Sequence, residues 1–127
     1  MSSFRVQQLG HVRTTAPLNA VGQTLQIACD PSGTALVQVL STASLAGCTL
    51  VFEGRLAEDA PWIVLSGYVT DGTAKQTVVA ITPTLTAVPA NGWLVSLNGV
   101  VQFRVRVSAI TGGSLHVGIR LSDTGHG

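Results

Sequence analysis

The sequence contains few charged residues. Seven Lys and Arg and six Asp and Glu make up 10% of its 127 residues and leave a formal net charge of +1, whereas about 25% of an ordinary domain is charged. Because 46% of the residues are hydrophobic, the composition excludes an intrinsically disordered chain, which is polar and highly charged. The near-neutral balance also argues against electrostatic capture of nucleic acid, which requires many cationic contacts to phosphate.

Long hydrophobic runs are absent. No stretch of about 18 apolar residues occurs without an interrupting Gly, Ser, Thr or charge. We therefore expect no membrane-spanning helix and no membrane partner. Residues 1–13 are polar, and no apolar run follows a basic start, so we also expect no secretory signal.

Residues that carry out catalysis or bind metals are scarce. The three histidines lack metal-ligand spacing, and no serine lies in a strand-to-helix nucleophile motif. A glycosidase pair built from Glu53 with Glu58 or Asp59 is disfavoured, because nothing in the pattern brings these carboxylates together. Without an export signal, Cys29 and Cys48 are expected to be reduced thiols, with a disulfide between them as the alternative. The sequence thus predicts no catalytic residue, no metal, no cofactor and no enzymatic function.

Short apolar segments with a period of two residues fill most of the chain. Turn residues separate them, and the chain holds 14 Gly. Strict alternation of apolar and polar residues is typical of strands with one buried face, and no segment has a helical period. The pattern predicts an all-β fold, an antiparallel β-sandwich of jelly-roll or Greek-key type. It has about eight strands, at 25–29, 36–40, 49–55, 62–69, 75–81, 92–97, 101–107 and 115–121.

Turn residues and breaks in the alternation predict where hairpins turn and where the domain begins and ends. Asp71-Gly72 and Asn98-Gly99 each follow an apolar run and predict hairpin turns. Residues 1–20 have no sustained period, so we expect an extended N-terminal arm there, with fraying at the terminus as the alternative. The β-sandwich domain then spans 21–123, and 124–127 form a flexible tail.

Two groups of side chains are candidates for partner binding. Arg104 and Arg106 alternate with inward valines. If the next strand forms a hairpin with theirs, Arg120 shares their face and completes a basic stripe for an acidic surface. The alternative is an ordinary solvated face. Trp62 and Trp93 are candidates for an aromatic platform, although a Trp near a strand start is more often a core or subunit contact.

Several segments resemble small structural proteins of tailed-bacteriophage virions. The resemblance covers about residues 34–121 and is carried by AGCTLVFEG at 46–54, PW at 61–62, ANGW at 90–93, FRVRVSA at 103–109 and TGGS at 111–114. In that family a Gly-Thr-Leu-x-Phe-Glu-Gly strand is followed by a Trp after a polar loop and by an Arg-Val-Arg strand. Residues 55–60 depart from it, because the family has a Gly-rich turn there, so no loop contacts are carried over.

The resemblance implies a capsid decoration (cement) protein. Such a protein would lie on the capsid surface of the virion, assembled in the host cytoplasm, with the major capsid protein as its partner. The scarcity of charge favours a homo-oligomer, a dimer or trimer, because apolar surface tends to form interfaces. In this interpretation the arm, with Phe4, Arg5 and Val6, adds a strand to a neighbour. The alternative is a tail- or baseplate-associated module that binds a carbohydrate or receptor, and a secreted enzyme accessory domain ranks last.

Overall fold

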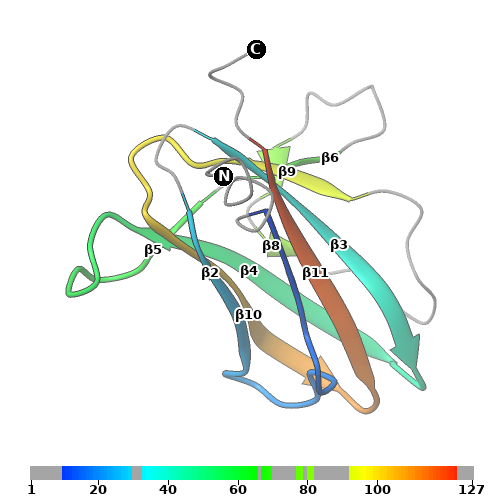
Figure 1. The fold of residues 1–127 in the computed structure, drawn as a ribbon. Coiled ribbons are helices and arrows are strands. Elements are labelled where there is room, and N and C mark those ends of the chain that lie inside the picture. The colour runs from blue at the N-terminus through cyan, green and yellow to red at the C-terminus, as the bar shows by residue number, and fades with distance from the viewer. Residues whose placement is uncertain are drawn as a thin grey trace.

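The computed structural model describes residues 10–29, 33–65, 67–69, 77–78, 80–81 and 92–122. They form two antiparallel sheets packed face to face (Figure 1). The strands are β1 (His11–Arg13), β2 (Thr24–Ala28), β3 (Thr34–Ala43), β4 (Gly47–Arg55), β5 (Ile63–Val64), β6 (Gly67–Val69), β7 (Thr77–Val78), β8 (Ala80–Ile81), β9 (Trp93–Ser96), β10 (Gln102–Thr111) and β11 (Ser114–Ser122). The predicted antiparallel β-sandwich is confirmed, while its jelly-roll or Greek-key type stays a prediction.

The two sheets differ in size. Sheet A has the strand order β1-β11-β3-β9-β6-β7, and sheet B has the order β2-β10-β4-β5, with β8 also pairing with β4. Each predicted strand has a counterpart, although 62–69 and 75–81 are each divided into two short strands. Within the described residues there is no helix long and apolar enough to cross a membrane.

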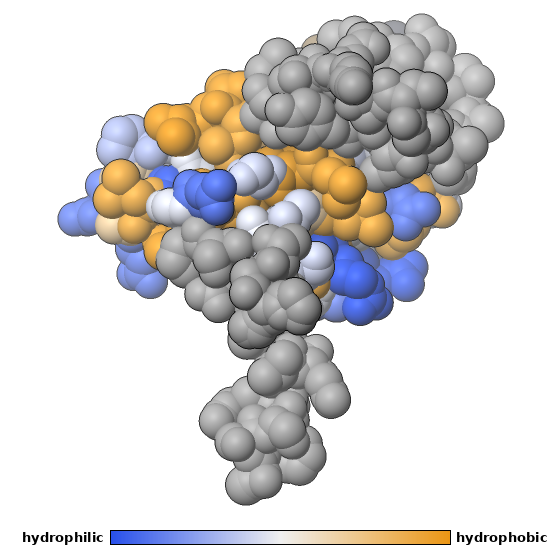
Figure 2. Space-filling view, turned by 90° about the horizontal axis from the view of Figure 1, so that it is seen from above, coloured by the Kyte–Doolittle hydropathy of each residue, from blue (hydrophilic) through white to orange (hydrophobic). Residues whose placement is uncertain are grey.

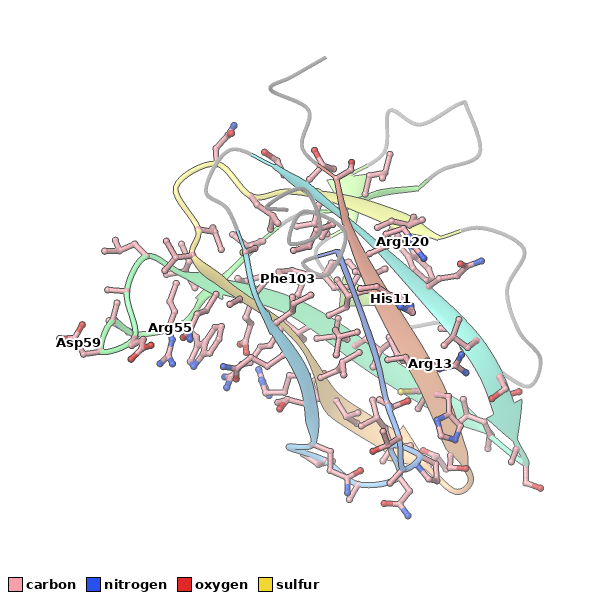
Figure 3. All side chains as sticks on the ribbon, in the orientation of Figure 1. His11, Arg13, Arg55, Asp59, Phe103 and Arg120 are labelled. Carbon is pink, nitrogen blue, oxygen red and sulfur yellow. The ribbon has the colours of Figure 1, made fainter. Side chains whose placement is uncertain are left out.

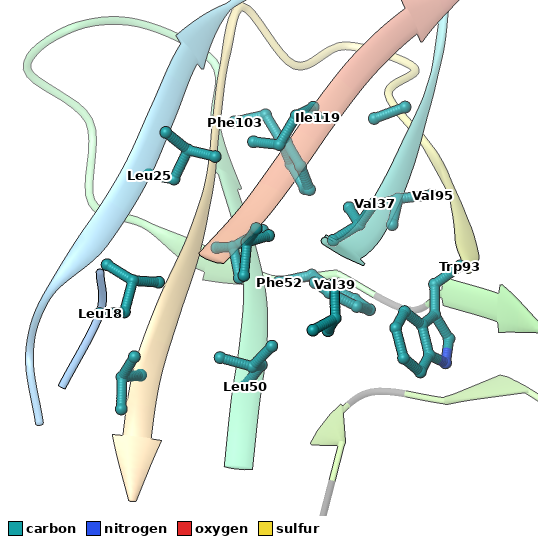
Figure 4. Close-up of a cluster of buried hydrophobic side chains, with 14 of the residues drawn as sticks. Leu18, Leu25, Val37, Val39, Leu50, Phe52, Trp93, Val95, Phe103 and Ile119 are labelled. Carbon is teal, nitrogen blue, oxygen red and sulfur yellow. The ribbon is translucent and has the colours of Figure 1, made fainter. Parts of the chain in front are cut away.

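The core lies between the sheets and follows from the alternation in the sequence. Phe103, Val105 and Val107 of β10 point inward and are 0% exposed. Inward side chains of β3, β4, β9 and β11 meet them in one cluster (Figure 4). The ring of Phe52 lies 6.4 Å from that of Phe103 and 6.4 Å from that of Trp93. Burial of these apolar surfaces is the main stabilisation of the fold.

Two connections carry the chain from one sheet to the other at the same end of the sandwich. Residues 44–46 link β3 in sheet A to β4 in sheet B, and Gly112-Gly113 link β10 to β11. Gly113 has a φ of 73°, and a Cβ there would collide with the carbonyl oxygens of Ser44 and Ala43. Glycine is therefore required where the two connections pack together.

The strand order corrects one of the two predicted hairpins. Asn98-Gly99 does form a tight turn, with Gly99 at a φ of 81° and the Val100 amide donating to the Leu97 carbonyl at 2.9 Å. However, β9 before it belongs to sheet A and β10 after it to sheet B, so the hairpin was wrong. The other predicted turn, Asp71-Gly72, lies outside the described residues.

The described half of the N-terminal segment is part of the sandwich. His11–Arg13 pair with β11 at the edge of sheet A, and Leu18 is only 5% exposed in the core. The Leu18 amide donates to the Leu115 carbonyl at 2.8 Å. From Gly10 onward, the segment assigned to an arm packs against the sheets.

The two cysteines lie far apart, and no disulfide joins them. The Cys29 amide donates to Val101 beside the start of β10, whereas Cys48 is opposite Ile110 near its end. Nine residues of strand span about 30 Å, and a disulfide needs Cα atoms within about 7 Å. Burial raises the pKa of the Cys48 thiol, which keeps it protonated and unreactive.

Candidate functional site

A group of basic and aromatic side chains lies on the outer face of sheet B. The register places Arg104 opposite Glu53 and Gln102 opposite Arg55 on neighbouring strands, and directly opposed residues share one face of a sheet. The loop after β4 brings Trp62 onto the same face. We call Arg55, Trp62, Arg104 and Arg106, with Glu53 between them, the Arg–Trp cluster.

Glu53 holds two of the arginines. Its side chain is 8% exposed. The Nε atoms of Arg104 and Arg106 donate to its Oε1 at 2.7 and 3.0 Å, and Nη2 of Arg106 donates to its Oε2 at 3.1 Å. Such charge-assisted bonds are about twice as strong as neutral ones, so the carboxylate fixes both guanidinium groups on the sheet.

The ionisation of Glu53 follows from this geometry. Burial would raise its pKa, but the hydrogen bonds from Arg106 and Arg104, together with their charges, lower it below the ordinary value of 4.5. The bond to Glu53 in turn raises the pKa of Arg106, against the opposing effect of burial. At neutral pH Glu53 is therefore an anion that orients arginines and has no proton to donate.

Trp62 is in contact with two guanidinium groups. The central carbon of Arg104 lies 4.1 Å from the centre of the ring, and that of Arg55 lies 4.3 Å from it. Nε of Arg55 donates to Oε1 of Gln102 at 2.7 Å. Each cation–π contact contributes about 0.5–1 kcal/mol at an exposed site. The half-buried ring is thus held in place while part of it faces solvent.

The cluster has excess positive charge and an apolar border. Three guanidinium groups oppose one carboxylate, which leaves a charge of +2. Leu56, Ile63 and Val64 beside it are 71%, 57% and 55% exposed. Trp and Arg next to exposed apolar residues are typical of protein interaction surfaces. The arrangement suits the binding of an acidic surface.

The predicted site residues other than Arg120 fall into three groups. Arg104, Arg106 and Trp62 meet in the cluster, but without the Arg120 of the basic-stripe hypothesis or the Trp93 of the platform hypothesis. Trp93 is 7% exposed and belongs to the core, the more common role for such a Trp. Phe4, Arg5 and Val6 lie outside the described residues.

Arg120 was wrongly grouped with Arg104 and Arg106. The prediction assumed that 101–107 and 115–121 form a hairpin within one sheet. Instead, the chain crosses from sheet B to sheet A at Gly112-Gly113, so Arg120 lies on the outer face of the opposite sheet, across from His11 of β1.

Two residues of the cluster were not predicted. Glu53 and Arg55 alternate with Phe52 and Gly54 along β4, which is a signal that they point outward. Their pairing with β10 depends on which strands are neighbours, and the alternation does not contain that information. Among the described residues, no group of three His, Cys, Asp or Glu is placed to hold a metal ion.

Comparison with known proteins finds similarity in structure only. No family model matches the chain, and no curated protein matches it in sequence. The crystal structure of the SPBc2 prophage-derived protein YomS superposes with a TM-score of 0.58 and 16% identity, over 88% of this chain and 95% of that protein. The PBSX exported protein XepA gives a TM-score of 0.60 and 20% identity, over 88% of this chain but only 38% of that protein. The sandwich is thus a fold shared with YomS and XepA.

Proposed function

We propose that this protein is a non-enzymatic structural protein of a phage particle, a decoration protein that binds the major capsid protein on the outside of the head. The observation that carries the proposal is the similarity to YomS, a prophage-derived protein whose fold matches nearly end to end. The resemblance of residues 34–121 to virion structural proteins supports the same role.

The Arg–Trp cluster is the attachment surface in this proposal. Its two arginines held by Glu53 present guanidinium groups in a fixed geometry, which suits carboxylates on a capsid subunit. The exposed residues Ile63 and Val64 of β5 add apolar contact. Modest affinity at each site is sufficient, because a shell offers many equivalent sites to an oligomeric ligand.

A second candidate is a tail- or baseplate-associated module that binds a carbohydrate or receptor. One observation favours it: the ring of Trp62 is only half-buried on the outer face of sheet B, and sugars stack on exposed aromatic rings. The match to XepA adds to this, since the chain corresponds to 38% of that longer exported protein, as a module would.

Co-sedimentation with separated phage heads and tails distinguishes the candidates. A decoration protein pellets with heads, and both Trp62→Ala and Arg55→Glu reduce its binding at least about tenfold, a change of 1.4 kcal/mol. Val21→Ala is the matched control, because Val21 is an exposed apolar residue outside the cluster. Binding to tails or to a glycan that is lost in Trp62→Ala supports the second candidate, and full binding to heads by both cluster variants refutes this attachment surface.

A further inference from the structure

The outer face of sheet A has a row of side chains that runs across its strands. His11 of β1 is opposite Arg120 of β11, Arg120 is opposite Leu36 of β3, and Leu36 is opposite Leu94 of β9. Because opposed residues share a face, this row joins a basic half to an apolar half. His11 and Arg120 are exposed, and Leu94 is 41% exposed.

Arg13 extends the basic half. It is opposite Gly118 on β11, two positions along from the pair formed by His11 and Arg120, and it is exposed. Both ion pairs among the described residues are made by Glu53 on the other sheet. Within that part of the chain, Arg13 and Arg120 therefore have no carboxylate partner.

The described carboxylates are concentrated elsewhere. Glu53 is on β4, and Glu58 and Asp59 are exposed in the loop between β4 and β5. Leu56 in the same loop is 71% exposed. The loop thus combines an apolar side chain with two negative charges, and the face of sheet A combines apolar side chains with two permanent positive charges.

The loop and the face cannot meet within one molecule. Figure 3 shows Asp59 at the tip of a loop that projects from one side of the sandwich, away from His11, Arg13 and Arg120 on the front sheet. Figure 2, a view from above, shows hydrophobic and hydrophilic residues side by side on the surface rather than in separate regions. A contact between the two features requires two copies of the chain.

We propose that the β4–β5 loop of one copy docks on the outer face of sheet A of a second copy. Glu58 and Asp59 pair with Arg13 and Arg120, and Leu56 packs against the apolar half of the row. Because two different surfaces meet, the contact is head-to-tail and generates a closed ring or a growing chain of copies.

The contact is weak in solution. Exposed ion pairs contribute about 0.2–1 kcal/mol each, and one apolar side chain contributes about 1.5–3 kcal/mol. Association should therefore increase with concentration and decrease with added salt, which screens exposed charges over about 10 Å at 0.1 M.

Sedimentation velocity of the purified protein tests the contact. At low salt the weight-average mass of the wild type should rise between about 10 and about 200 µM, a range that brackets weak affinities. Arg120→Glu and Asp59→Lys should each weaken association at least about fivefold. The double variant, which reverses both charges, should recover association to within about twofold of the wild type.

The control is Thr111→Glu, which adds a carboxylate at an exposed position outside both surfaces and should leave association unchanged. A wild type that stays monomeric throughout the range overturns the proposal. The proposal is also overturned if the single charge reversals associate as strongly as the control, or if the double variant does not recover association. The assay contains no phage particle, so failure here leaves the decoration role standing and tested separately.

Discussion

At the scale of single residues, Glu53 explains how Arg104 and Arg106 share one sheet face. Arg104 and Arg106 project from the same side of β10 and would repel each other. Glu53 is directly opposite Arg104 and accepts hydrogen bonds from both. The sequence pattern predicted the two arginines as a pair, but their shared anion depends on strand pairing. The cluster is therefore a fixed structural unit with an excess of positive charge, and not a loose group of charges.

Replacing Glu53 by Ala should lower the free energy of unfolding by about 2–3 kcal/mol. The substitution leaves two partly buried guanidinium groups without their acceptor. Urea denaturation measures the change, and Glu58→Ala in the exposed loop is the control, with an expected effect within about 0.5 kcal/mol. Equal effects of the two substitutions would mean that Glu53 does not hold the arginines.

The pH dependence of stability should report the lowered pKa of Glu53. Because its pKa in the folded protein is below the ordinary value of 4.5, the ionised carboxylate contributes its full stabilisation above that value. The contribution is lost as the pH falls through the folded pKa. The stability difference between wild type and Glu53→Gln should thus be constant at neutral pH and shrink below about pH 4.5. Urea denaturation at several pH values measures it, and a difference that grows in acid contradicts the prediction.

At the scale of elements, the alternation predicted the strands but not their sheets. Phe103, Val105 and Val107 point inward as their period requires. A period of two is the same whether a turn makes a hairpin or carries the chain to the facing sheet, which is why Arg120 was placed on the wrong face. Gly113 lies where the chain crosses between the sheets, and it packs against the connection between β3 and β4.

Gly113→Ala should destabilise the fold clearly more than Gly112→Ala. Both glycines have positive φ values, 73° and 61°, so both substitutions incur a backbone strain of about 1 kcal/mol. A Cβ at Gly112 meets open space, whereas one at Gly113 would lie 2.6 Å from the Ala43 carbonyl oxygen. Thermal unfolding of both variants measures the additional loss of stability in Gly113→Ala. Equal losses of stability in the two variants would contradict the packing of the two connections.

Leu18→Ala should lower the free energy of unfolding by about 2–5 kcal/mol. Leu18 belongs to the segment that the sequence assigned to an arm, but it is 5% exposed in the core. Val21→Ala, at a position 63% exposed, is the control and should stay within about 0.5 kcal/mol. Chemical denaturation measures both changes. If Leu18→Ala left the stability unchanged, the segment would not be part of the core and the predicted arm would be supported.

At the scale of the whole molecule, the sandwich presents different chemistry on its two outer faces. Sheet B has the Arg–Trp cluster, and sheet A has the row from His11 to Leu94. The low charge of the sequence predicted a protein that assembles through its surface. Which arginines lie on which face could be assigned only from the strand order of the structure. In our account the outer face of sheet B binds the particle, and the outer face of sheet A binds the β4–β5 loop of a sister copy.

Electron microscopy of the phage particle tests the central claim most directly. The account predicts density for this sandwich on the outer surface of the head, with the outer face of sheet B and Trp62 against the capsid subunits. Density confined to the tail, or sandwiches on the head whose Arg–Trp cluster faces solvent, would contradict it.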